Sequence, residues 1–123
     1  MTELVYLASP YSHPDPAVRA ERHAMVCRAA GALMRRGMVI FCPMAHSLAI
    51  AEHGELPTEW TFWKMQDEVF LAKCDRMIIL TLDGYDKSIG IADERIIFQH
   101  MGKPIDFMTY EEAICGLRRL PAA

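Results

Sequence analysis

The sequence predicts an α/β fold in which a parallel sheet lies between two layers of helices, with residues 1–123 forming one domain. Three observations support this prediction. Short apolar segments of strand length alternate along the chain with helical patterns. These segments are apolar at consecutive positions, as in strands that are buried on both faces. The stretches between them are long enough for the helical crossovers that parallel strands require.

Prolines and capping residues place the first boundaries. Strands are expected at residues 4–8, 38–42, 76–82 and 105–108, and helices from 16 to before Gly37, at 44–52, at 58–73, from 89 to before Gly102 and from 110 to near Arg119. Residues 9–16 contain too many prolines for regular structure. Asp15 followed by Pro16 is a favourable N-cap and N1 pair, and Gly37 is expected as the C′ residue of the first helix. Pro43 is expected to stop the second strand.

The later helices have start signals of their own. Thr58 and Ser88 are each expected to be an N-cap residue. Thr109 and Glu112 fit a capping box for the last helix. A Gly-Lys-Pro turn beginning at Gly102 leads into the fourth strand.

This order of elements predicts a flavodoxin-like or Rossmann-like three-layer sandwich. Its parallel sheet is expected to have four to five strands in the order 2-1-3-4, with a fifth strand following strand 4 if one is present. Strands 1 and 3 are then neighbours, and the topological switch point lies between them. The loops after those two strands, 9–15 and 83–88, have the most unusual sequences in the chain, so a ligand site is expected there.

Composition limits the classes of function. The chain is 52% hydrophobic and 24% charged, with a net charge of −3, which is typical of a soluble globular protein. This charge gives no general attraction to polymeric nucleic acid or to an anionic membrane. No apolar run approaches the roughly 18 residues of a membrane span, and no signal peptide is visible, so a cytoplasmic protein is expected.

The cysteines predict neither disulfides nor a metal site. They are widely spaced, each in an apolar pattern, and are expected to be four reduced core thiols: Cys27, Cys42, Cys74 and Cys115. Cys42, His46 and His53 match no zinc-binding spacing, so no metal is expected.

Two carboxylates interrupt apolar helical stripes. Glu94 shares a stripe with Ile91 and Phe98, and it lies too far from Ser88 to belong to a capping box. Burying an unpaired carboxylate is costly, so Glu94 is either functional or half-exposed at the edge of the stripe. Asp67 interrupts the stripe of the 58–73 helix in the same way.

Both carboxylates are expected near the carboxyl edge of the sheet. Such a pair suits glycosyl transfer, with one group at the anomeric carbon and the other protonating the leaving group. The alternative for Asp67 is a rim residue bonded to backbone or to Lys64. Tyr6, near the end of the first strand, is a candidate hydrogen-bond donor to such a carboxylate or a plain core residue.

Other polar groups at the switch point are candidates for binding. Ser88 and Gly90 offer a hydroxyl and free N–H groups at a helix start, which suit a phosphate or a sugar hydroxyl, although Ser88 is also an ordinary N-cap. Asp83 is either a turn former or a contact to a ribose hydroxyl. Trp60 and Trp63 either pack between helices or stack on a base.

A family resemblance follows from these motifs. The chain reads YLASP at residues 6–10, has Asp67 at the appropriate distance upstream of S-x-G-x-x-x-E at residues 88–94, and has GKPI at 102–105. In these features, which span nearly the whole chain, it resembles the nucleoside 2-deoxyribosyltransferase superfamily. The serine six residues before the glutamate makes it most similar to the 2′-deoxynucleoside 5′-monophosphate N-hydrolase branch.

The resemblance implies roles for the matching residues. Glu94 corresponds to the nucleophile that attacks C1′, Asp67 to the acid that protonates the leaving base, and Tyr6 to the residue that holds the nucleophile. Ser88 and Gly90 correspond to 5′-phosphate contacts. The resemblance also implies a small nucleoside or nucleotide as substrate, no cofactor, and a homodimer or homotetramer.

The chain departs from the branch in its first loop. That loop is glycine-rich with an arginine in the branch, but here it reads SPYSH from Ser9 to His13. Ser9 is expected to contact substrate, and His13 or Arg19 to replace the missing arginine. The acidic residue that precedes the glutamate in the transferases is replaced here by KSIG at residues 87–90, which favours a hydrolase.

Three hypotheses therefore arise from the sequence. The first is an N-glycosidase acting on nucleosides or their 5′-monophosphates. The second is base exchange by a nucleoside deoxyribosyltransferase. The third is a nucleotide-binding module without catalysis.

Overall fold

The computed structural model of the chain describes residues 2–115 and contains a four-stranded parallel sheet in the order β2-β1-β3-β4. The elements are β1 (Leu4–Ala8), α1 (Pro16–Arg35), β2 (Val39–Phe41), α2 (Pro43–His53), α3 (Trp60–Lys73), β3 (Arg76–Leu80), the short 3₁₀ helix η1 (Tyr85–Lys87), α4 (Ile89–His100), β4 (Ile105–Met108) and α5 (Tyr110–Cys115). This confirms the predicted fold class and strand order, with four strands in the part described.

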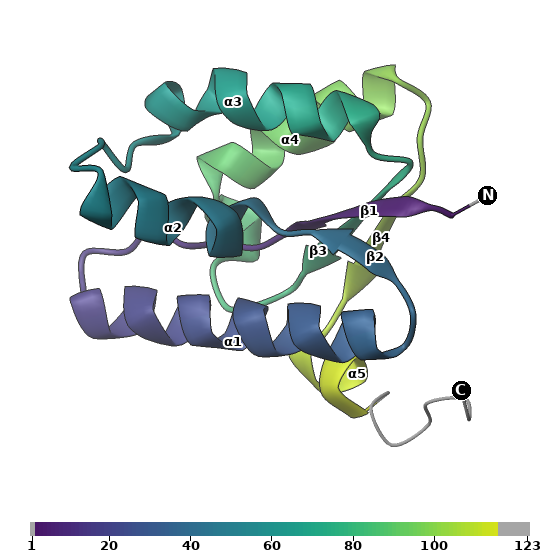
Figure 1. Cartoon of the computed structure of the whole chain (residues 1–123), viewed down its shortest axis with the longest axis horizontal. Coiled ribbons are helices and arrows are strands. Elements are labelled where there is room, and N and C mark those ends of the chain that lie inside the picture. Colours follow the sequence, from purple (N-terminus) through teal and green to yellow (C-terminus); the bar gives the residue numbers. More distant parts are fainter. Residues whose placement is uncertain (1, 116–123) are drawn as a thin grey trace.

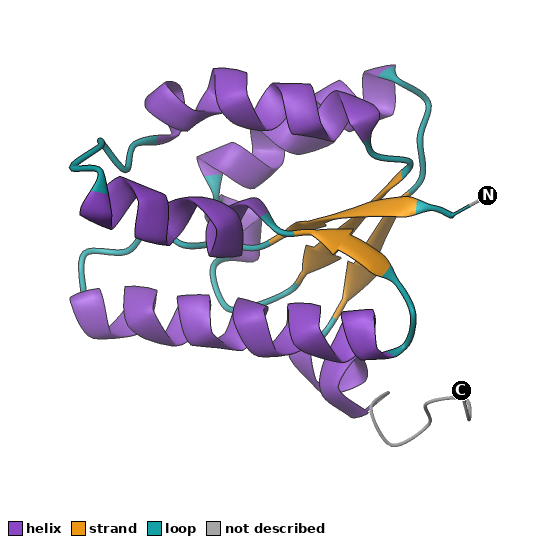
Figure 2. Ribbon diagram, viewed as in Figure 1, coloured by secondary structure: helices purple, strands orange, loops and turns teal. Residues whose placement is uncertain are grey.

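The helices form a layer on each side of the sheet. Figure 1 shows α3 and α4 over one face and α1 and α5 over the other, with α2 at the end where β1 and β2 finish. The secondary-structure colouring in Figure 2 shows the sheet between these two helical layers. The protein therefore has the three-layer arrangement that the alternating pattern predicted.

The two central strands supply apolar side chains to both layers. Along β1, Val5 and Leu7 belong to the core beneath α1, whereas Tyr6 and Ala8 belong to the core beneath α3 and α4. Residues of β3 alternate in the same way. Because successive strand residues point to opposite faces, a sheet covered on both sides requires apolar residues at consecutive positions.

Most of the predicted helix caps are confirmed. Asp15 accepts a hydrogen bond from the Ala17 backbone N–H at 2.9 Å, and Gly37 has a φ of +92° just after α1. Thr109 and Glu112 exchange the two bonds of a capping box at 2.8 and 3.0 Å.

The predicted cap at Thr58 is wrong. Helix α3 begins at Trp60, and Glu59 occupies the N-cap position without a capping side chain. The first turn closes when the Phe62 N–H donates to the Glu59 carbonyl at 3.1 Å, so Thr58 lies outside the helix.

Smaller boundary differences are found at Pro43 and at the end of β3. Pro43 begins α2 at its N1 position rather than only ending β2. Strand β3 ends at Leu80, because the N–H of Leu82 turns back to the Leu80 carbonyl. The predicted helix end near Arg119 lies outside the described residues.

All four cysteines are free, but they are not all in the core. Cys42 and Cys74 are buried, Cys27 is half-buried and Cys115 is exposed. The prediction for Cys115 is wrong, since Ala113 is the residue that α5 buries. In the described part of the chain, no helix is long and apolar enough to cross a membrane.

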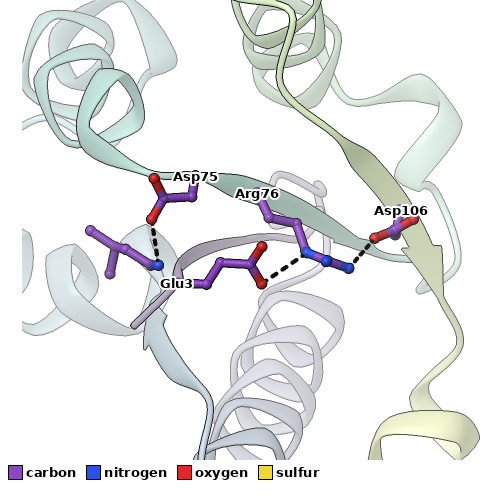
Figure 3. Close-up of polar contacts among 5 residues, drawn as sticks. Glu3, Asp75, Arg76 and Asp106 are labelled. Carbon is purple, nitrogen blue, oxygen red and sulfur yellow. Dashed lines mark hydrogen bonds and ion pairs between the residues drawn. The ribbon is translucent and has the colours of Figure 1, made fainter. Parts of the chain in front are cut away.

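Charged residues join the strands at the amino end of the sheet. Arg76, at the start of β3, pairs with Glu3 at 3.0 Å and with Asp106 of β4 at 2.8 Å (Figure 3). Asp75 accepts a hydrogen bond from the Leu4 N–H at 2.8 Å. These groups are partly exposed and contribute little stability individually. They fix strand ends opposite the edge at which ligands bind in such sheets.

Candidate active site at the switch point

A cavity of about 700 Å³ lies beyond the carboxyl end of β1 and is called the switch-point cavity below. The loop after β1, one side of α2, the first half of α3 and the segment 84–94 form its wall. Both Glu94 and Asp67 line it. The fold thus brings together the two loops and the two carboxyls that the sequence singled out.

Glu94 is held by Tyr6. Glu94 lies in the second turn of α4 and is only 5% exposed, and Tyr6 of β1 is fully buried. The Tyr6 hydroxyl donates a hydrogen bond to Glu94 Oε2. Tyr6 does not line the cavity, so it acts on the carboxyl from behind.

The environment of Glu94 favours its protonated form. The pKa of this carboxyl is raised to about 8, mainly by burial and to a smaller extent by the nearby charges of Asp67 and Asp93. The hydrogen bond from Tyr6 acts in the opposite direction and lowers the pKa. Burial, followed by the charge of Glu94, raises the pKa of the Tyr6 hydroxyl, so Tyr6 stays a donor.

Asp67 also lines the switch-point cavity. It is 7% exposed, and its Oδ1 atom forms no hydrogen bond within the described residues. Lys64, a suggested partner, instead lies 4.0 Å from Glu68 and 3.8 Å from Asp93. Burial raises the pKa of Asp67 to about 6. A buried carboxyl that lines a cavity with an unsatisfied oxygen is a candidate acid or base.

The two tryptophans line the cavity in fixed orientations. Trp60 Nε1 donates to Asp93 at 2.7 Å, and Trp63 Nε1 donates to the Pro57 carbonyl at 2.8 Å. The two indoles precede Asp67 on the same helix by seven and four residues, so all three side chains share one face of α3. Apolar aromatic surface therefore adjoins the unpartnered carboxyl.

Ser88 and Gly90 line the cavity at the start of α4. Ser88 is an N-cap, because its Oγ accepts from the Ile91 N–H at 3.2 Å. A Cβ atom added at Gly90 would lie 3.5 Å from the Trp60 ring, an ordinary contact distance. Packing within the protein therefore does not require glycine at this position.

The first loop is only partly as expected. Ser9 and His13 line the cavity, and the Ser9 hydroxyl is buried without a hydrogen-bond partner among the described residues. Arg19 does not line it, because its guanidinium is directed to the carbonyls of His13 and Pro14. Asp83 does not line it either and is exposed at the loop surface. The suggested ligand role of Asp83 thus has no support from the cavity geometry.

Two cations in the cavity wall were not selected from the sequence. Arg22 of α1 and Lys87 of η1 both line the cavity. Arg22 is one of several arginines off the apolar face of α1, and nothing in the linear pattern distinguishes it from Arg19. Only the packing of α1 against the two loops does so.

These features define the class of protein: a flavodoxin-like α/β domain with two buried carboxyls in a cavity at its switch point. The sequence matches the family described as Domain of unknown function (DUF1937) over residues 3–111, and the chain belongs to that family. No curated protein matches the sequence significantly.

Proposed function

We propose that the protein is an N-glycosidase that cleaves the bond between base and sugar in a nucleoside or nucleoside 5′-monophosphate. The supporting observation is the pair of buried carboxyls, Glu94 and Asp67, in one cavity, with Glu94 oriented by Tyr6. The resemblance of residues 6–10 and 88–94 to the nucleoside 2-deoxyribosyltransferase superfamily assigns the same residues to catalysis.

The reaction proceeds in two steps with one proton on the carboxyl pair. Glu94 attacks C1′, so a C1′–O bond forms while the C1′–N bond breaks and its electron pair goes to the base. Asp67 donates its proton to the leaving base. Water then attacks C1′ and gives a proton to Asp67, and Glu94 is released as a carboxylate, which restores the starting state.

In the empty site, the single proton that the reaction needs lies mainly on Glu94 rather than on Asp67. With pKa values of about 8 for Glu94 and about 6 for Asp67, the empty site at pH 7 holds one proton, mainly on Glu94. Reaction uses the tautomer with that proton on Asp67. Positive charge that develops at C1′ favours the ionised form of Glu94, so the required tautomer becomes more stable along the reaction path.

Variants of Glu94 test the proposal. The wild-type protein is incubated with a panel of nucleosides and 5′-monophosphates, and released base is measured by chromatography. We expect release by the wild type and none by Glu94→Gln, which retains the shape of the side chain. Equal release by the variant would exclude the proposed role, and no release by the wild type from any substrate would exclude the proposed activity.

A further inference from the structure

Arg22 joins the two loops that border the switch-point cavity. Its Nη1 atom donates to the Ser12 carbonyl at 2.8 Å and to the Tyr11 carbonyl at 3.4 Å. Its Nη2 atom donates to the Asp83 carbonyl at 2.8 Å. A single guanidinium therefore sets the spacing between the loop after β1 and the loop after β3.

Gly84 allows this close approach. Its φ of +92° lies in the left-handed region that glycine adopts readily. A Cβ atom at this position would lie 2.6 Å from Arg22 Nη2, closer than a real contact permits. Both its positive φ and its lack of a side chain therefore allow the Arg22 guanidinium to lie against the backbone of Gly84.

The contacts of Arg22 leave its charge uncompensated. All three acceptors are neutral carbonyls, and no carboxylate of residues 2–115 lies within 4.0 Å of its guanidinium. A guanidinium has five N–H donors, so at least two remain for a ligand. Arg22 lines the cavity together with Lys87, which is three residues beyond Gly84. The wall next to the N-terminus of α4 is therefore positive, as an anionic ligand requires.

We propose that Arg22 is the residue that makes the cavity select a nucleoside 5′-monophosphate over the unphosphorylated nucleoside. The guanidinium supplies positive charge and free donors to the phosphate, and it holds both loops at the spacing that the sugar phosphate needs. This inference rests on the proposed N-glycosidase function. It gives Arg22 the role that the sequence suggested for His13 or Arg19, which was to replace the arginine absent from the first loop.

The first test compares kcat/KM for a deoxynucleoside 5′-monophosphate with kcat/KM for the matching deoxynucleoside. In Arg22→Gln, we expect the ratio of the two values to fall by about tenfold or more, mainly through KM for the monophosphate. Arg22→Lys keeps the charge but lacks the planar fork, so it should recover part of the ratio. Arg19→Gln is the matched control, because Arg19 also binds loop carbonyls from α1 but lies outside the cavity wall.

A purely structural role for Arg22 gives a different result. Loss of loop spacing alone would lower kcat/KM for both substrates by the same factor, and an unchanged ratio in Arg22→Gln would overturn the inference. If Arg22→Gln does not fold by circular dichroism, Lys87→Gln and Arg22→Lys take its place. For each of these two variants, we expect a lower ratio of kcat/KM for the monophosphate to kcat/KM for the nucleoside than in the wild type. An unchanged ratio in both variants would overturn the inference.

The second test uses binding without turnover. Calorimetry of the wild-type protein with 2-deoxyribose 5-phosphate and with 2-deoxyribose should show tighter binding of the phosphate, weakened by added salt. Arg22→Gln should lose that preference. If the wild type binds the sugar phosphate selectively but releases no base, the glycosidase proposal fails while the role of Arg22 stands. If the wild type releases base but binds both sugars equally, the glycosidase proposal stands and the role of Arg22 fails.

Discussion

Tyr6 and Glu94 are separated by 88 positions in the sequence, yet the Tyr6 hydroxyl donates a hydrogen bond to Glu94 Oε2 in the protein interior. Tyr6 comes from the central strand β1 and Glu94 from α4, so the contact ties the sheet to the helix that follows β3. The bond lowers the pKa of a carboxyl that burial raises. Tyr6 therefore favours the ionised form that a nucleophile needs.

Removal of the Tyr6 hydroxyl should change the pH profile. The one-proton form of the carboxyl pair predicts a bell-shaped kcat/KM profile with limbs near the pKa values of about 6 and about 8. In Tyr6→Phe, the maximum should fall by about tenfold and the alkaline limb should move to higher pH. Tyr85→Phe, outside the cavity wall, is the control. An alkaline limb that stays in place would contradict the role of Tyr6.

Neutralising Glu94 should stabilise the protein at alkaline pH. The folded state raises the pKa of Glu94 from 4.5 to about 8, so it binds more protons than the unfolded state in this window. Its stability therefore falls as pH rises through the window. At pH 9, Glu94→Gln should exceed the wild type in free energy of unfolding by on the order of 3 kcal/mol, and by much less at pH 5.

Urea denaturation at the two pH values measures this difference. Glu21→Gln changes an exposed carboxyl on α1 and should leave the pH dependence as in the wild type. If Glu94→Gln shows the same pH dependence as the wild type, the carboxyl is not buried in the way described.

Asp67→Asn should affect substrates according to their leaving group. For an ordinary nucleotide, we expect base release to fall by about 10² to 10⁴, because no proton reaches the base. The base of an N7-methylated purine nucleotide leaves without protonation, so the rate of its release should fall much less. Rates of base release measured by chromatography compare the two, with Glu68→Gln on the same helix as control. Equal losses for both substrates would argue against an acid role.

Gly90→Ala should separate stability from activity. Alanine is favoured over glycine in helices by up to about 1 kcal/mol, and a Cβ at position 90 has room beside Trp60. We expect an unchanged or higher melting temperature but a higher KM, since the methyl group enters the cavity wall. Gly31→Ala in α1, where no described residue lies within 4 Å of an added Cβ, should stabilise without changing KM. A Gly90 variant with normal KM would show that substrate does not approach this backbone.

Local signals were sufficient for much of the fold. The caps at Asp15 and Ser88 form within three residues of chain, so sequence alone identifies them. The predicted cap at Thr58 was wrong because the first turn closes one residue later, on the Glu59 carbonyl, and no side chain caps it. The prediction that Cys115 lies in the core was wrong because a short apolar pattern does not reveal which side of a helix is covered.

The sequence by itself determined the parallel order of strands and identified Glu94 and Asp67 as carboxylates on apolar stripes. Periodicity carries this information, because an acidic residue at a core position needs a reason. Only the tertiary structure decided which cations reach the cavity, placing Arg22 in its wall and leaving Arg19 outside. Both arginines lie on the same helix, and their difference arises from how α1 packs against two loops from distant parts of the chain, which no local pattern encodes.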